Sequence, residues 1–320
     1  MTTQKVSLME NQPASHRYLV AQKNIDLQMK AAIYSRLMDD DQQKDFQLFF
    51  DELATQNIEP VIFYDFFDQI KDSIHLPADT KTFSLSEDLT DEIEFIISLG
   101  GDGTLLDTVT LVRDKKISIM GINFGRLGFL ASIGRDEVKK AVQAIAKRTY
   151  VEDTRTLIHL DASIPMFGNV PYALNDFSIH KRDVASMIKI HTYLNGEFLN
   201  TYWADGLIVA TPTGSTGYSL SCNGPIVFPD SGSFVITPVA PHNLNVRPIV
   251  VPDNNIISFE IESRADEIIC ALDSRREIVR NDIQLAIKKE SFDIKLVRLS
   301  ENNFLQTLRN KLTWGLDKRN

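Results

Sequence analysis

The sequence predicts two domains, an N-terminal α/β domain with a parallel sheet and a β-rich, sandwich-like C-terminal domain. Between residues 30 and about 130, short apolar runs that suit buried strands alternate with segments of helical periodicity, as in a parallel α/β sheet. After Thr149 the helical periodicity largely disappears, and alternating runs separated by turn residues take its place, as in antiparallel sheets. A chain of 320 residues is long enough to form both cores.

Strands and helices of the first domain follow one another in a regular order. Apolar, often β-branched runs predict buried strands at 31–35, 61–64, 95–99 and 117–122. Two helices are predicted where apolar side chains recur three and four positions apart and so share one face. These side chains are Phe46, Phe49, Phe50 and Leu53 in the first helix, and Val138, Ala141, Val142 and Ile145 in the second, which covers about 135–147.

The expected domain limits follow from these changes of pattern. We expect the α/β domain over 29–130 and the β-rich domain over 131–296. The tail, 297–320, is expected to pack back on the first domain because it has apolar side chains at helical spacing. These are Phe304, Leu305, Leu308 and Leu312, with Trp314 beyond them. Residues 1–28 are polar and weakly patterned, so we expect an extension whose deletion leaves activity and stability nearly unchanged.

Composition narrows the class of protein. Lys and Arg total 34 against 43 Asp and Glu, and the resulting net charge of -9 gives no support for a nucleic-acid or anionic-membrane partner. The two cysteines, Cys222 and Cys270, are too few for a disulfide framework and lack the spacing of a zinc site. No apolar run is long enough to span a membrane and no signal peptide is recognisable, so the predicted location is the cytoplasm.

Three glycines mark the predicted phosphate site, in the string Gly100-Gly101-Asp102-Gly103-Thr104. The string follows the third predicted strand and precedes a segment that can start a helix, so free backbone N–H groups and the helix dipole favour an anion there. Asp102 in that positive field suits a carboxylate that assists a metal or takes a proton from a hydroxyl. The alternative is a tight turn with a helix-capping Asp.

Two common nucleotide signatures are absent. The sequence contains no Gly-Lys pair and therefore no Walker A loop. The dinucleotide fingerprint fails as well, because the glycine turn lacks its third glycine and the position about 20 residues further on is Asn123, not an acid.

Three other polar segments are candidates for ligand contacts. The loop after the fourth strand could let Asn123 and Phe129 line a cleft, although an interdomain hinge explains its glycines equally well. The Asn175-Asp176 pair suits ribose hydroxyls but could also form a turn. From Thr211 to Tyr218 the chain is dense in Thr, Ser and Gly, which could wrap a polar ligand while Tyr218 stacks on a base. The alternative for this block is a Ser/Thr-rich turn.

Taken together, these segments resemble the NAD kinases, which phosphorylate the adenosine ribose 2′-hydroxyl of NAD to give NADP. The resemblance covers about 29–316. A lone Gly-Gly-Asp-Gly-Thr string also occurs in lipid kinases of the diacylglycerol and sphingosine type, and the Thr-Pro-Thr-Gly-Ser-Thr-Gly-Tyr block separates the two families. The specific parts are the glycine turn, Leu127-Gly128-Phe129, Asn175-Asp176, the block Asp205 to Pro225, Pro241-His242 with Arg247-Pro248, and Leu312-Thr313-Trp314-Gly315.

The resemblance implies the NAD kinase fold and a set of residue roles. Asp102 would be the catalytic base or a carboxylate that assists the metal. The residues implied to bind NAD are Asp102, Gly103, Phe129, Asn175, Asp176, Asp205, Thr213, Thr216, Gly217, Tyr218, Ser219, Leu220 and Ser221. Those implied to hold the ATP phosphates are Gly100, Gly101, Gly103 and Thr104. ATP and a divalent metal ion, Mg²⁺, are the implied donor and cofactor, with no dedicated protein cage for the metal, and a homodimer or homotetramer is expected.

Two other functions stay open from the sequence: an NAD(P)-sensing module without turnover, and a lipid kinase of the diacylglycerol type. A lipid acceptor would need an apolar groove, whereas the block at 205–225 is polar. The sequence also departs from the usual family pattern in ways that concern the nicotinamide end and the subunit contacts. The departures are Asp176 for Glu, Gly217 for Ala, Trp203 for a basic residue, and Asp273-Ser274-Arg275 for the family's Asp-Gly/Ser-Gln motif.

Overall fold

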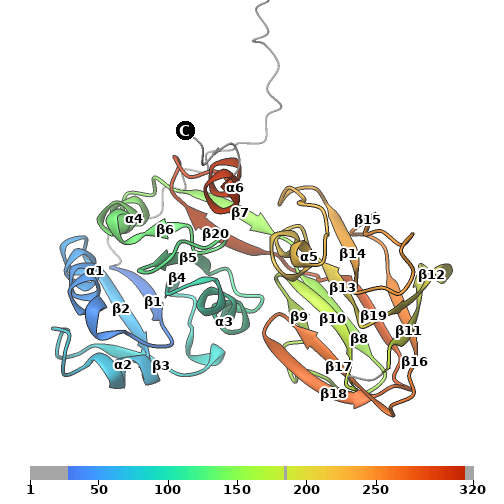
Figure 1. Ribbon diagram of the computed structural model, residues 1–320. Coiled ribbons are helices and arrows are strands. Elements are labelled where there is room, and N and C mark those ends of the chain that lie inside the picture. Colours follow the sequence, from blue (N-terminus) through green and yellow to red (C-terminus); the bar gives the residue numbers. More distant parts are fainter. Residues whose placement is uncertain (1–27, 184–185, 314–320) are drawn as a thin grey trace, which may run out of the picture.

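Two units built on different kinds of sheet make up the protein. The computed structural model describes residues 28–183 and 186–313, and Figure 1 shows an α/β unit beside a β-sandwich. The fold class predicted from the sequence is therefore confirmed. Expectations that fall on residues 1–27, Trp314 and Gly315 lie outside the described residues. Within the described part of the chain, no helix has the length and apolar character needed to cross a membrane.

A largely parallel sheet forms the first unit, in the order β3-β2-β1-β4-β5-β20-β7, with β6 paired to β5. Neighbouring strands run parallel except for β20 and β7. The strands predicted from the sequence correspond to β1, β2, β4 and β5. The bounds are Met29–Tyr34 (β1), Ile58–Phe63 (β2), Lys81–Phe83 (β3), Ile93–Leu99 (β4), Ser118–Asn123 (β5), Ile133–Gly134 (β6), Val151–Arg155 (β7) and Ile294–Arg298 (β20).

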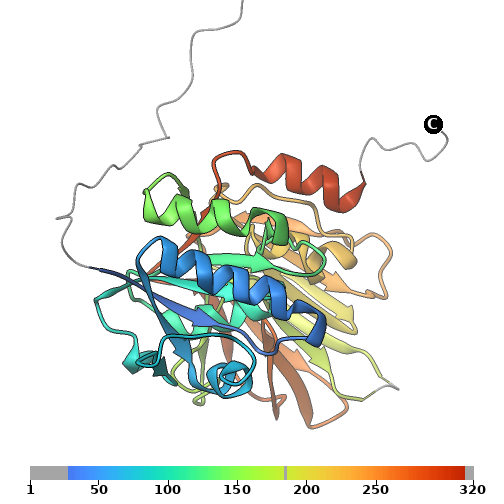
Figure 2. The same cartoon turned by 90° about the vertical axis from the view of Figure 1, so that its left-hand side faces the viewer.

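Helices cover both faces of this sheet. On one face pack α1 (Gln43–Thr55), α2 (Tyr64–Ile70) and α4 (Val138–Ala146), and α1 and α4 run side by side (Figure 2). The apolar side chains predicted to share a face in α1 and α4 are buried there. On the opposite face packs α3 (Asp102–Val112), in a core that also includes Leu174 of the second unit. The α3 face of the sheet therefore meets the sandwich.

The order of strands in the parallel sheet reverses between β1 and β4. From β1 the chain moves outward to β2 and β3, and it then returns to the other side of β1 with β4 and β5. The carboxyl ends of β1 and β4 therefore lie at a topological switch point, which is where ligands bind in open α/β sheets.

The chain leaves the first sheet after β7, later than the expected domain limit at residue 130. It returns to that sheet with β20, which begins just before the expected limit at residue 296. Both β7 and β20 belong to the first sheet, and they pair antiparallel with Arg155 opposite Ile294. The alternating pattern of β7 is typical of an antiparallel strand, and β7 does pair antiparallel with β20. Because β20 belongs to the largely parallel sheet, β7 extends that sheet and not the sandwich. Alternation thus identifies the type of strand and not the sheet that it joins.

Two six-stranded antiparallel sheets form the second unit, in the orders β15-β14-β13-β10-β17-β18 and β12-β11-β16-β19-β8-β9. Apolar side chains such as Phe177 and Ile179 of β10 fill the core of the sandwich. The bounds are Ile158–Ala162 (β8), Tyr172–Ala173 (β9), Asp176–Lys181 (β10), Ile188–Leu194 (β11), Glu197–Ala204 (β12), Gly206–Ala210 (β13), Ser233–Val239 (β14), Ile249–Pro252 (β15), Ile257–Glu262 (β16), Glu267–Leu272 (β17), Arg275–Arg280 (β18) and Leu285–Lys289 (β19).

The tail helix α6 (Phe304–Leu312) touches both units. It begins at Asn303, whose side chain accepts the N–H of Gln306 at 2.9 Å. Just before it, Glu301 pairs with Lys140 of α4, and the ring centroid of Phe304 lies 5.3 Å from that of Phe228 in the sandwich. The short helical segments are Asp40–Gln42 (η1), Ser86–Asp88 (η2), Arg135–Glu137 (η3), Gly214–Thr216 (η4) and Tyr218–Ser221 (α5).

Candidate active site

The glycine turn joins β4 to α3. Gly100 has a φ of 152°, and a Cβ at this position would lie 2.5 Å from Thr104 Oγ1, so the turn requires glycine here. The Gly100 N–H donates to the carbonyl of Ile122 in β5 at 2.8 Å, which fixes the turn on the sheet. The turn therefore presents the first N–H groups of an 11-residue helix beside the switch point of the sheet.

The Asp102 carboxylate is held by the loop that follows β5. Its Oδ2 accepts the N–H of Phe129 at 2.8 Å, and its Oδ1 accepts those of Leu130 and Ala131 at 3.1 and 2.9 Å. These bonds and the helix N-terminus both stabilise the negative charge. Because Oδ1 takes two of the three N–H groups, Oδ2 keeps more acceptor capacity for a ligand.

Close contact between Asp102 and its loop depends on Gly128. A Cβ on Gly128 would lie 1.7 Å from Asp102 Oδ1, closer than any non-bonded contact. Gly125 in the same loop is less restricted, since a Cβ there would find its nearest atom, Asn123 Oδ1, at 3.5 Å. Of the two glycines, only Gly128 is required by the carboxylate.

Asn123 holds the loop together. Its Oδ1 accepts the N–H of Gly125 at 2.9 Å, and its Nδ2 donates to the carbonyl of Arg126 at 2.8 Å. The side chain is buried, and its amide is satisfied by its own loop. The expectation that Asn123 faces a cleft is therefore wrong, because the turn after β5 uses both ends of the amide.

A second carboxylate, Asp273, organises the Asn175-Asp176 pair. It lies in the turn between β17 and β18 and accepts the backbone N–H groups of Leu174 at 2.9 Å, Asn175 at 2.7 Å and Asp176 at 3.2 Å. Burial raises the pKa of Asp273, and these N–H groups oppose the rise. Burial, together with the charge of Asp273, raises the pKa of Asp176 to about 7. Near neutral pH Asp176 thus exchanges between an acceptor-only carboxylate and an acid that can also donate.

The Ser/Thr-rich block packs directly on this pair. The Thr211 N–H donates to the Asn175 carbonyl at 2.8 Å, and Thr211 Oγ1 donates to the Leu174 carbonyl at 2.6 Å. A Cβ on Gly214 would lie 2.0 Å from the Asn175 carbonyl oxygen, so the approach requires glycine at this position. The block and the Asn175-Asp176 pair therefore form one rigid wall.

Several hydroxyl groups of the block are already engaged inside the fold. Ser215, Thr216 and Ser219 each hydrogen-bond to other residues of the second unit. Tyr218, in contrast, is 42% exposed, and its ring centroid lies 5.6 Å from that of His180. The block thus offers an aromatic surface to a ligand beside its backbone.

A cavity of about 420 Å³ opens beside β10. Three residues of β10 line the cavity, namely Asp176, Ser178 and His180. Side chains alternate along a strand, so the intervening Phe177 and Ile179 lie in the core. The remaining lining residues are Leu106, Asn175, Tyr218, Ala271, Asp273 and Ser274. A cavity of this volume, with polar groups from β10 along one side, suits a nucleoside-sized ligand. Leu106 stands four residues after Asp102 in α3, so one helix face connects the cavity to the glycine turn.

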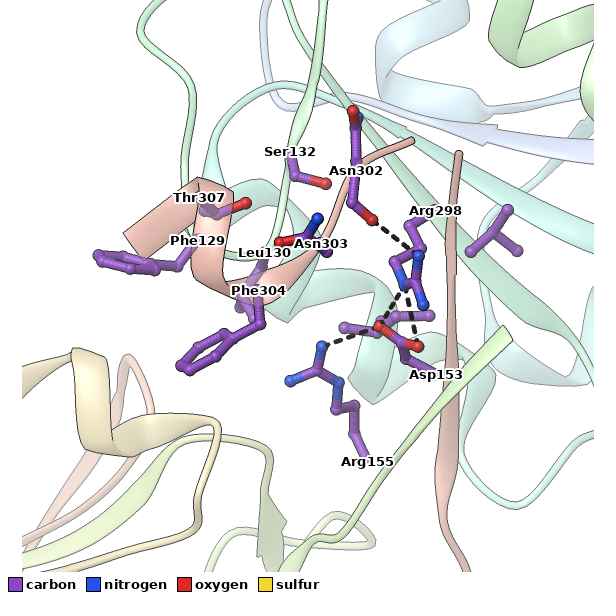
Figure 3. Close-up of a pocket in the computed structure, with 12 residues that line it drawn as sticks. Phe129, Leu130, Ser132, Asp153, Arg155, Arg298, Asn302, Asn303, Phe304 and Thr307 are labelled. Carbon is purple, nitrogen blue, oxygen red and sulfur yellow. Dashed lines mark hydrogen bonds and ion pairs between the residues drawn. The ribbon is translucent and has the colours of Figure 1, made fainter. Parts of the chain in front are cut away.

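A smaller pocket, of about 30 Å³, lies between the Asp102 loop and the tail (Figure 3). Arg298 Nε donates to both oxygens of Asp153, at 3.0 and 2.9 Å, and Arg155 Nη2 lies 3.4 Å from the same carboxylate. Arg155 also reaches Thr213 of the block, at 3.5 Å. The other lining residues are Phe129, Leu130, Ser132, Leu296, Val297, Asn302, Asn303, Phe304 and Thr307.

Comparison with known proteins identifies the family. The ATP-NAD kinase N-terminal domain matches residues 16–150, and the ATP-NAD kinase C-terminal domain matches residues 174–299. The chain belongs to the ATP-NAD kinase family. The first match begins inside the segment 1–28 that we expect to be an extension.

Curated relatives and solved structures agree with this family. NAD kinases of Cytophaga hutchinsonii and Flavobacterium psychrophilum are 52% identical over 248 residues and 44% identical over 294 residues. These alignments cover 78% and 91% of this chain, and 85% and 100% of the relatives. An Archaeoglobus fulgidus NAD kinase in complex with ATP has a TM-score of 0.69 at 25% identity, covering 89% of this chain and 99% of that one. Yeast NADH kinase complexed with NADH shares the fold, with a TM-score of 0.81 at 22% identity, covering 92% and 89%.

Membership of the ATP-NAD kinase family makes the protein an enzyme. The curated relatives named above are NAD kinases, which supports phosphorylation of NAD over a lipid kinase and over a sensor without turnover.

The structure groups the residues that the NAD kinase resemblance singles out. Asn175, Asp176 and Tyr218 line the larger cavity, and Phe129 lines the smaller pocket. Thr213 accepts a hydrogen bond at 3.5 Å from Arg155, which lines the smaller pocket. The turn residues Gly100, Gly101, Asp102, Gly103 and Thr104 lie together at the start of α3. The remaining residues of the set line neither of these two pockets: Asp205, Thr216, Gly217, Ser219, Leu220 and Ser221. The ligand-binding roles of the whole set stay predictions.

Several residues at these pockets are missing from the sequence-based set. Ser178 and His180 follow Asp176 at intervals of two, so the alternation of β10 could have identified them. Asp273 was noted only as a departure from the family pattern. Arg155 and Arg298 carry no local signal, because their meeting depends on the pairing of β7 with β20.

Proposed function

We propose that this NAD kinase transfers the terminal phosphoryl group of ATP to the 2′-hydroxyl of the adenosine ribose of NAD, with Asp102 as the general base. One observation carries the proposal: the Asp102 carboxylate stands at the start of α3, between the glycine turn and the helix face that borders the larger cavity. A donor held at the turn and an acceptor held in the cavity would therefore meet at this carboxylate. Such positioning is the main requirement of phosphoryl transfer.

The acceptor would be fixed by the wall that contains Asn175 and Asp176. Their side chains line a cavity large enough for a nucleoside, and an amide beside a carboxyl group suits a pair of ribose hydroxyls. Tyr218 offers a partly exposed ring for stacking on a base. We assign the adenine end to Thr213 and the segment Thr216–Ser221, and the nicotinamide side to Asp205.

Asp102 would accept the proton that the 2′-hydroxyl loses as its oxygen bonds to the terminal phosphorus of ATP. The bond from that phosphorus to the bridging oxygen breaks at the same step, and ADP leaves. Oδ2 is the oxygen suited to this step, because it receives only the Phe129 N–H in the free enzyme. The amides of Leu130 and Ala131 keep Oδ1 in place and so fix the direction of the carboxylate. General-base assistance of this kind accelerates a reaction by ~10²–10⁴-fold.

The donor phosphates would lie at the N–H groups of Gly100, Gly101, Gly103 and Thr104. A Mg²⁺ ion would accompany ATP and neutralise charge on its phosphates when bound. Among the described residues no group of three or more His, Cys, Asp or Glu could hold a metal ion. In this proposal the metal is carried chiefly by the nucleotide, with Asp102 as the carboxylate of the turn.

Formation of NADP is the direct test. The purified enzyme, NAD, ATP and Mg²⁺ are incubated, and NADP is measured with an NADP-specific dehydrogenase. Asp102→Asn should lose most of kcat while NAD binding, measured by calorimetry, is retained. Asp114→Asn, a control at the exposed far end of α3, should behave as wild type. NAD binding without NADP formation in the wild type would favour a sensor, and normal turnover by Asp102→Asn would refute the proposed base.

Assembly and location are separate parts of the proposal. A homodimer or homotetramer, as the family resemblance implies, would appear in light scattering coupled to gel filtration, whereas a monomer of 36.2 kDa would contradict it. Cell fractionation tests the proposed cytoplasmic location.

A further inference from the structure

Arg36 stands at the switch point of the parallel sheet, opposite the glycine turn. In the parallel pairing of β1 with β4, Tyr34 lies beside Ser98. Arg36 and Gly100 each follow this pair by two residues, so both lie at the same edge of the sheet. The switch point at the carboxyl ends of these two strands is the expected ligand position in an open α/β sheet. Arg36 therefore faces the place where the donor phosphates are proposed to lie.

The guanidinium of Arg36 lies across the first turn of α3. Its Nη2 donates to the Gly103 carbonyl at 3.2 Å, and a Cβ on Gly103 would find Arg36 Nη1 as its nearest neighbour, at 3.6 Å. The guanidinium therefore lies beside the first turn of α3, at ordinary contact distance from position 103. Within the described residues, no other Lys or Arg side chain hydrogen-bonds to the turn 100–104.

Asp107 fixes the direction of Arg36. Its carboxylate accepts Arg36 Nε at 2.5 Å and Nη2 at 2.8 Å, and it also accepts the Tyr34 hydroxyl at 3.0 Å. The fork is therefore held in place before a ligand arrives, which lowers the entropy cost of binding. The Arg36 side chain is 50% exposed, so the ion pair adds little to stability and does not by itself account for the arrangement.

Phosphates bound at this turn would gain from a basic side chain in addition to the Mg²⁺ that accompanies ATP. The turn contains an acid, Asp102, and no basic residue, while the phosphates of a nucleoside triphosphate bring several negative charges. In P-loop enzymes a lysine of the loop itself supplies the positive charge, and this sequence has no Gly-Lys pair. A basic side chain at the carboxyl end of the neighbouring strand, β1, could supply this positive charge.

We propose that Arg36 binds the phosphate chain of the donor nucleotide through the Nη1 side of its guanidinium, with Asp107 as a positioning residue. This inference rests on the proposed function, because it needs the donor to lie at the glycine turn. Arg36 would add a positively charged side chain to a donor site in which the other proposed phosphate contacts are backbone N–H groups.

The test separates donor binding from acceptor binding. Arg36→Gln should raise the KM for ATP, and the Kd for Mg²⁺-ATP titrated without NAD, by about 10- to 100-fold, the loss typical of a hydrogen bond to a charged group. The KM for NAD should change less than about twofold, and the melting temperature should stay close to that of the wild type. Arg36→Lys keeps the charge and should recover much of the ATP affinity.

A matched control lies at the other end of the same helix. Arg113, the residue after α3, pairs with Glu87 at 2.8 Å, and Arg113→Gln breaks this ion pair without touching the turn. An unchanged Kd for ATP in Arg36→Gln, or an equal loss in Arg113→Gln, would overturn the proposal. If the wild type bound ATP but formed no NADP, the proposed function would fail while the Arg36 assignment would still be decided by the ATP titration.

Discussion

Replacing Gly128 by alanine tests whether the loop after β5 holds the Asp102 carboxylate in the position that catalysis requires. The added Cβ would lie 1.7 Å from Asp102 Oδ1 and 2.4 Å from its Cγ, so the carboxylate must move. Movement breaks up to three hydrogen bonds from backbone N–H groups, at 2.8, 3.1 and 2.9 Å. Each hydrogen bond to a charged group contributes about 1.5–3 kcal/mol, and water replaces part of this. We therefore expect a loss of about 3 kcal/mol in the free energy of unfolding.

The same displacement removes the base from its position, so kcat should fall by ~10²–10⁴-fold. Urea denaturation and NADP formation measure the two effects. Gly125→Ala in the same loop is the control, since its Cβ would find the nearest atom at 3.5 Å and should change the free energy of unfolding by less than about 1 kcal/mol. A Gly128→Ala enzyme with wild-type stability and kcat would show that the three N–H groups neither hold Asp102 firmly nor matter for turnover.

Three further predictions concern the wall of the cavity and the tail. Folding raises the pKa of Asp176 from its ordinary 3.8 to about 7. Between these values the folded state keeps a proton that the unfolded state loses. The free energy of unfolding should therefore fall by up to about 4 kcal/mol as pH rises from about 4 to 7. Asp176→Asn should reduce this slope in urea denaturation at pH 5 and 8; an unchanged slope would contradict the assignment. Gly214→Ala would place a Cβ 2.0 Å from the Asn175 carbonyl oxygen, against 3.6 Å to the nearest atom for the control Gly134→Ala, outside the wall, so only the first should raise the KM for NAD and lower stability, by about 1–3 kcal/mol. Phe304→Ala removes a ring contact of 5.3 Å with Phe228 and should lower stability by about 1 kcal/mol and speed proteolysis of the tail; equal rates in both proteins would count against this docking.

Local signals in the sequence predict those parts of the fold and site that one segment determines. The strand, turn and helix around Asp102 lie together in the chain, and the glycines, the apolar run and the helix start all indicate the same structure. Likewise, the alternation of β10 separates Asp176, Ser178 and His180 from the core residues between them. In both segments the sequence contains the information because the determining contacts are short-range.

Contacts between distant segments are what the sequence leaves out. Asp102 receives its N–H groups from residues 27 to 29 positions later, and Asp273 receives its own from residues 97 to 99 positions earlier. A backbone N–H donor is the same in every residue except proline, so no residue type marks these partners in advance. Gly128 is the one sequence signal of such a contact. The reason that glycine is needed there becomes clear only once Asp102 is known to lie beside it.

The two carboxylates also show why residue type alone does not assign a role. Asp102 and Asp273 each accept three backbone N–H groups, yet Asp102 stands at a helix N-terminus beside the switch point of the sheet, whereas Asp273 ties a turn to Asn175 and Asp176. In both arrangements Oδ2 has a single donor, but only the Oδ2 of Asp102 lies beside the turn where we propose that phosphate binds. The second shapes the acceptor wall and, through its charge, contributes to the raised pKa of Asp176. Under the proposed function, therefore, one carboxylate would receive a proton, and the other would control the group that holds the acceptor.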